Sequence, residues 1–228
     1  MSRFFHLYQF LGPALLTPLA AFLWLRHYHG DARLAIIAVA VPILHAYIVP
    51  GIGTNVLKMW AFNTRLRLGK FRPQHGFVFG GATAILALPL VGAPDPSASP
   101  ADIAIAAALV GAALFIVNWI YDALALQHRI LEVYNQPWAD GAGPWTIAAD
   151  YSPWFFGVFG LIYAAGLKMS EGVLMPEPSS NHAWLCGAFV TDATISTPTL
   201  LYIAASLFRH GHTGLRPCVR HARTGCKT

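Results

Sequence analysis

The segment DIAIAAALVGAALFIVNWIYDALAL, residues 102–126, is a long apolar run whose only charged residues are two aspartates. A helix rises about 1.5 Å per residue, so about 20 residues cross the roughly 30 Å hydrocarbon core of a membrane. Similar runs occupy residues 8–26, 32–50 (in one interpretation extending to Trp60), 75–93, 152–168 and 183–208. Because backbone polar groups must be hydrogen-bonded inside lipid, we predict an all-α integral membrane protein with about six transmembrane helices in one bundle.

The composition supports this prediction. Hydrophobic residues make up 56% of the 228 residues and charged residues 11%, and the mean hydropathy is +0.51. A soluble domain carries about 25% charged residues, so lipid is the expected solvent for much of this surface. Three cysteines without framework spacing argue against a disulfide-stapled module. The first apolar run lacks the small-residue cleavage pattern of a signal peptide, so we expect it to be the first span.

The distribution of basic residues predicts the orientation. With the N-terminus, the loops 51–74 and 126–151 and the tail on one side, that side holds 12 of the 15 Lys and Arg residues. Positive charge stays in the cytoplasm, so both termini are expected there, in a bacterial cytoplasmic membrane. We expect a polytopic domain over residues 1–208 and a flexible basic tail over 209–228. The basic segments flank apolar spans, which favours lipid headgroups over nucleic acid as their partner.

Polar side chains lie unexpectedly deep in three of the predicted spans. Asn118 and Asp122 are four residues apart and share one helix face, Asp192 lies well inside the sixth span, and His45 lies in the second. An ionisable residue at membrane depth is costly, so it is by default a functional hypothesis. The alternatives are that Asp192 only fixes helix packing and that His45 is a neutral, hydrogen-bonded core residue.

These residues lead to a prediction of function. The sequence favours a membrane-embedded enzyme that acts on a lipid or isoprenoid by proton transfer, as an isomerase, cyclase or hydratase. Asp192 is the predicted acid or base, His45 and Asp122 are its partners, and Asn118 positions the substrate. No cofactor is predicted, and no family signature is identified. The residues predicted to bind substrate are Trp119, Tyr121, Trp154, Phe155, Thr194, Ser196, Arg65 and Arg72.

Three alternatives stay open. A proton-coupled transporter would suit the proline-interrupted helices, although six spans without a repeat would require a homodimer. A non-catalytic assembly subunit would use the same polar groups between helices. No metal is predicted, but His128 and Glu132, four residues apart, could bind one ion from a single helical turn, with His75 as a further ligand. Cys218, His221 and Cys226 form a weaker zinc-like pattern in the tail.

Overall fold

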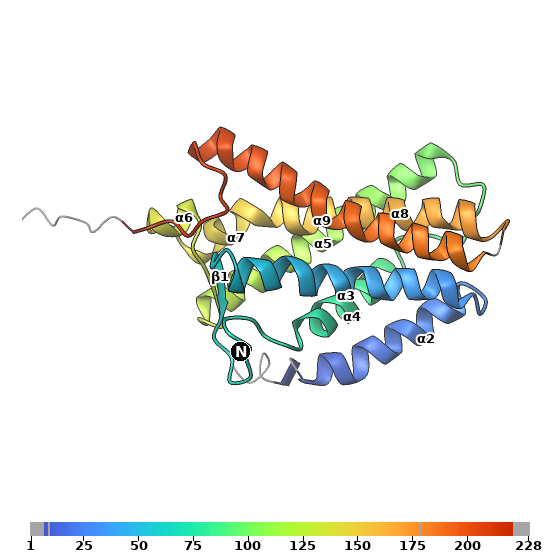
Figure 1. Cartoon of the computed structure of the whole chain (residues 1–228), viewed down its shortest axis with the longest axis horizontal. Coiled ribbons are helices and arrows are strands. Elements are labelled where there is room, and N and C mark those ends of the chain that lie inside the picture. Colours follow the sequence, from blue (N-terminus) through green and yellow to red (C-terminus); the bar gives the residue numbers. More distant parts are fainter. Residues whose placement is uncertain (1–6, 9, 178, 221–228) are drawn as a thin grey trace, which may run out of the picture.

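The structure of the chain, a computed structural model, describes residues 7, 8, 10–177 and 179–220. The described chain is mostly helical, with one pair of short strands (Figure 1). Its elements, in which η denotes a π-helical turn, are η1 (Gly12–Leu16), α2 (Thr17–His27), α3 (Ala32–Asn55), β1 (Trp60–Phe62), α4 (His75–Ala87), α5 (Pro100–Gln127), β2 (Leu131–Val133), α6 (Gln136–Ala139), α7 (Pro144–Ser152), η2 (Pro153–Val158), α8 (Phe159–Leu174) and α9 (Ser180–His210).

Two helices in the described part of the chain are long and apolar enough to cross a membrane. They are α3 and α5, with hydropathies of 2.1 and 2.4 over their most apolar stretches. The apolar helix α4 has 13 residues and ends at Ala87, short of the expected 75–93. The fold is therefore a helical one with two candidate spans, which gives weak support for association with a membrane.

The long helices lie side by side, and their connections alternate between two ends of the molecule (Figure 1). Helix α3 is central and packs against α2, α4, α8 and α9, whereas α5 packs against α7, η2 and α8. The loops α2–α3, α4–α5 and α8–α9 lie at one end. The strands, α6 and α7 lie at the other, together with the end of α9.

The two strands were not predicted. β1 and β2 pair antiparallel, with Trp60 opposite Val133 and Phe62 opposite Leu131. Helix α3 ends at Asn55, so its predicted continuation to Trp60 is wrong. Lys58 and Arg129 adopt positive φ, which turns the chain out of each helix and into a strand.

Glycines allow close helix contacts in the core. A Cβ on Gly160 of α8 would lie 2.8 Å from the Cα of Gly111 in α5, and a Cβ on Gly80 of α4 would lie 2.7 Å from the Ile43 backbone. Backbones therefore approach more closely than any larger residue permits. Between α2 and α4, the buried Trp24 indole donates to the Ala84 carbonyl at 2.9 Å.

A buried ion pair lies at the end of the molecule that holds the α2–α3, α4–α5 and α8–α9 loops, opposite the strands. The Lys168 ammonium bonds to Glu171 Oε2 within α8, and the two side chains are 4% and 0% exposed. Glu171 also accepts from the Tyr28 hydroxyl at 3.1 Å and from the Asp95 amide at 2.9 Å, and Lys168 donates to the Ala93 carbonyl at 2.9 Å. This network fastens the α2–α3 and α4–α5 connections to α8.

Candidate binding cavity

A cavity of about 300 Å³ lies between α3, α4, α5 and η2, next to the strands. Its volume is at the lower end of the range for small-molecule sites. Most of the wall is apolar, with Phe79, Leu86, Leu114 and Phe155 among its residues. The polar and ionisable side chains that line it are Tyr8, His45, Arg72, His75, Thr83, Asn118, Tyr121, Asp122 and Tyr151.

Arg72 is the most unusual residue of this wall. It precedes α4, is only 2% exposed, and its guanidinium carbon lies 5.2 Å from the centre of the Phe62 ring. Its Nη2 lies 2.8 Å from His75 Nδ1, and its Nε has no hydrogen-bond partner among the described residues. Because a guanidinium only donates, His75 Nδ1 must accept, which leaves the proton of a neutral imidazole on Nε2.

Asp122 lines the same cavity from α5. Its Oδ2 accepts a hydrogen bond from the Tyr151 hydroxyl at 2.8 Å. Tyr151 is buried at the end of α7 and also lines the cavity. The bond joins α5 to α7 and fixes the orientation of the carboxyl group.

His45 and Asn118 complete the polar part of the wall. His45 is 3% exposed, its ring centre lies 4.3 Å from that of Phe159, and its Nδ1 has no partner among the described residues. Asn118 donates to the Leu114 carbonyl at 2.9 Å, which uses one N–H of its amide. The structure thus brings three of the four predicted catalytic residues, His45, Asn118 and Asp122, to one cavity.

The fourth residue, Asp192, lies elsewhere. It is exposed on the surface of α9 and does not line the cavity. Asp192 therefore does not join His45 and Asn118 at the cavity, because the face of α9 that packs inward carries Val190, Thr194 and Pro198 instead. Helical spacing identified a polar stripe on α9 but did not show which way it faces.

The predicted substrate-binding residues are divided in the same way. Arg72, Tyr121 and Phe155 line the cavity, and Tyr121 lies close enough to interact with the Arg72 side chain. The other five do not line it. Trp119 donates a hydrogen bond to the Trp145 carbonyl at 3.1 Å, and the hydroxyls of Thr194 and Ser196 donate to backbone carbonyls of α9. Trp154 is half-buried and Arg65 is exposed.

The alternative metal site is not assembled. Among the residues that the structure describes, no three His, Cys, Asp or Glu side chains are placed to hold an ion. Glu132 lies in β2 rather than on a helical turn with the exposed His128. It accepts instead from Tyr134 and Asn63, and the hydrogen bond from Tyr134 lowers the pKa of Glu132. His221 and Cys226 of the tail pattern lie outside the described residues.

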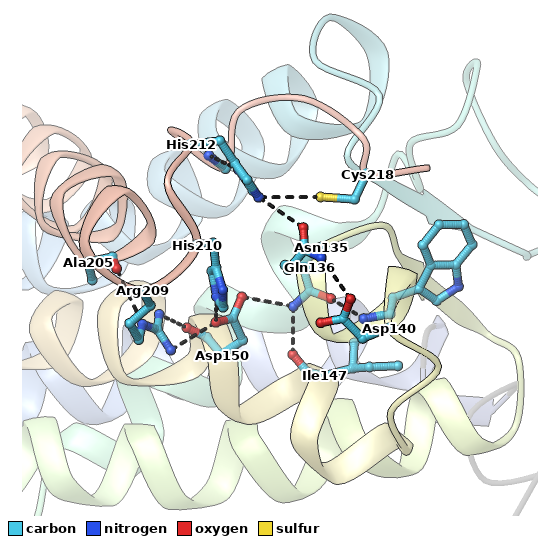
Figure 2. A network of polar contacts seen from close by, with 12 residues as sticks. Asn135, Gln136, Asp140, Ile147, Asp150, Ala205, Arg209, His210, His212 and Cys218 are labelled. Atoms are coloured by element: carbon cyan, nitrogen blue, oxygen red, sulfur yellow. Dashed lines mark hydrogen bonds and ion pairs between the residues drawn. The ribbon is translucent and has the colours of Figure 1, made fainter. Parts of the chain in front are cut away.

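A second polar cluster joins α9 to α7 (Figure 2). The buried Asp150 carboxylate accepts from Arg209 Nη1 at 2.9 Å and from Asn135 at 3.0 Å, and it lies 3.0 Å from His210 Nε2. Beyond α9, His212 contacts Gln136 and Cys218 (Figure 2). The tail up to residue 220 is therefore held against α6 and α7, whereas 221–228, also predicted to be flexible, lie outside the described residues.

Two members of the cavity wall were missed as functional residues in the sequence. His75 was considered only as a metal ligand, although its spacing of three residues from Arg72 was visible. Tyr151 gave no signal, because its partner Asp122 is 29 residues away.

No protein-family model, no curated protein and no solved structure matches this chain. Functional interpretation therefore depends on the geometry of the cavity itself.

Proposed function

We propose that the chain is a multi-pass membrane protein with about six membrane-crossing segments and cytoplasmic termini, in a bacterial cytoplasmic membrane. Support comes from apolar surface: only 28% of the most apolar stretch of α5 is buried. On α9, Leu185 is 67% exposed and Phe208 is 93% exposed. Exposed apolar surface of this extent is typical of contact with lipid or protein. The alternation of the connections between two ends also agrees with the bias of basic residues (Figure 1).

The cavity supports an enzyme that acts on a lipid or isoprenoid by proton transfer, of the isomerase, cyclase or hydratase type. The observation that carries this proposal is that Asp122, His75 and His45 line one mostly apolar cavity. A carboxyl group and an imidazole within one cavity are suited to removing a proton at one substrate atom and returning one at another. Exclusion of water strengthens their electrostatic interactions with a bound molecule.

The roles within this proposal follow from the hydrogen bonds. Tyr151 orients Asp122 as the group that takes or gives the proton. Arg72 holds His75 with its proton on Nε2, so that His75 serves as a hydrogen-bond donor to the substrate. Asn118 and His45 are the proposed positioning groups. Asp192 is given no role here, since it does not line the cavity.

The test begins with mass spectrometry of lipids that accumulate in cells lacking the chain. The accumulated compound is then supplied to purified wild-type protein and to two matched variants, Asp122→Asn in the cavity and Asp192→Asn on α9. We expect product formation to fall by a factor of about 100 or more in Asp122→Asn and to persist in Asp192→Asn. Full product formation by a folded Asp122→Asn protein would contradict the proposal.

One observation favours a second candidate function, a subunit of a larger membrane assembly. Asp192 is exposed on a helix whose surface also carries exposed Trp184 and Phe189. A carboxylate is costly against lipid, so another protein or a second copy would cover this face in that case. Native mass spectrometry of the membrane extract distinguishes this function from a single-chain enzyme. A proton-coupled transporter is tested separately by substrate uptake into proteoliposomes.

A further inference from the structure

We propose that the cavity binds a single-chain or compact apolar molecule with an anionic head, a carboxylate or phosphate, and that Arg72 recognises this head. The inference rests on the proposed function, because it specifies the ligand of the same site. It depends on the surroundings of Arg72, whose buried charge has no carboxylate of a described residue within ion-pair distance.

Arg72 is 2% exposed, and no carboxylate oxygen of a described residue lies within 4.0 Å of its nitrogens. Its hydrogen bond goes to His75, a neutral acceptor, and its other close neighbours are the face of Phe62 and the neutral side chain of Tyr121. A buried charge is strongly unfavourable unless it is paired. The unpartnered Nε leaves donor capacity on the planar guanidinium, which suits the oxygens of a carboxylate or phosphate.

The rest of the cavity indicates what is attached to the head. Beyond the polar groups the wall is formed by Val49, Phe79, Leu86, Leu114 and Phe156. A wall of this kind accommodates a hydrocarbon chain or ring. The volume of about 300 Å³ favours one compact body and leaves no room for both tails of a phospholipid.

Asp122 provides the competing explanation for Arg72. Both residues line the cavity, so Arg72 could serve only to balance the charge of Asp122 across it. In that case the protein would not distinguish an anionic head from a neutral one. Removing the Arg72 charge would then weaken the binding of both heads alike.

The experiment measures binding of four probes to the full chain in nanodiscs by calorimetry: dodecanoate, dodecyl phosphate, dodecanol and dodecyltrimethylammonium. We expect one or both anions to bind about 10-fold or more tightly than the alcohol, and the cation to bind worst, since charge-assisted hydrogen bonds are about twice as strong as neutral ones. The two anions separate a carboxylate head from a phosphate head.

Three variants complete the design. Arg72→Gln should lose about 10- to 100-fold in affinity for the preferred anion and less than about threefold for dodecanol. Arg72→Lys should retain part of the selectivity, because it keeps the charge without the planar fork. Arg65→Gln, an exposed position in the same connection with the same change of charge, should match wild type.

Equal wild-type binding of dodecanol and both anions would overturn this inference, as would an equal loss of acid and alcohol in a folded Arg72→Gln protein. These results concern recognition of the head and require no turnover. Failure of the Asp122 test would instead remove the proton-transfer chemistry and leave the selectivity intact, so the two failures are distinguishable.

Discussion

Replacing Glu171 by glutamine should destabilise the protein severely, although the two side chains have nearly the same shape. In wild type, Oε2 receives both the Lys168 ammonium and the Asp95 amide, and Oε1 receives the Tyr28 hydroxyl. The amide oxygen of glutamine can take the position of Oε2. Its NH2 group would then face the Tyr28 hydroxyl, which can rotate and accept.

The hydrogen bonds are thus largely retained, and what is lost is the negative charge. Lys168, which is 4% exposed, would keep a buried positive charge without its counter-ion. Removing one partner of a buried ion pair costs about 3–5 kcal/mol. For a chain of this size about 1 kcal/mol corresponds to about 2–4 °C in Tm, so we expect Tm to fall by about 6–20 °C.

The assay is thermal unfolding of purified protein in detergent. Glu177→Gln, an exposed position in the connection to α9, is the control for a change of one charge. The double variant Lys168→Met/Glu171→Leu removes both charges and should recover much of the lost stability. A Glu171→Gln protein that unfolds within about 2 °C of the control would refute the reasoning, since it would mean that the Lys168 charge is solvated.

Two further predictions concern packing and pH. Gly160→Ala should destabilise the protein by about 1–3 kcal/mol, because the new methyl group would meet the Gly111 backbone. Gly51→Ala in α3, which has open space around it, should be neutral or stabilising. Chemical unfolding measures both variants, and equal effects would contradict the packing argument. The difference in free energy of unfolding between wild type and Glu132→Gln should become smaller as the pH is lowered. The bond from Tyr134 lowers the pKa of Glu132 in the folded state, so its contribution is present above about pH 4.3 and is lost as the pH falls through that lower pKa. A difference in Tm that is the same at neutral and acidic pH would contradict this assignment.

Much of the local structure was predictable from the sequence. The apolar run 102–126 corresponds to α5, which begins after a capping box between Ser99 and Asp102. The run 32–50 corresponds to α3, whose N-cap is Asp31. Asn118 and Asp122 lie on the same face of α5, as their spacing predicted. Local spacing was sufficient in these cases because each feature depends on residues within a few turns of the same helix.

The strands and the ion pairs were not predictable in this way. β1 and β2 are three residues each and pair across about 70 residues of sequence, so neither shows a periodic pattern of its own. In the sequence, Lys168 is only one of the three basic residues that lie on the side opposite the predicted cytoplasmic one. Its burial beside Glu171 depends on the connections at Tyr28 and Asp95, which come from distant parts of the chain.

The sequence by itself determined which segments are helical and apolar, and which of them contain ionisable groups. Only the tertiary structure decided which groups face a cavity: Asp122 and His45 do, and Asp192 does not. The physical reason is that neither a helix that is apolar nearly all round, such as α5, nor a polar stripe, such as that of α9, marks which side meets the neighbouring helices. The rotation of a helix about its own axis is fixed by the shapes of its neighbours, through contacts such as those of Gly111 with Gly160 and of Gly80 with Ile43.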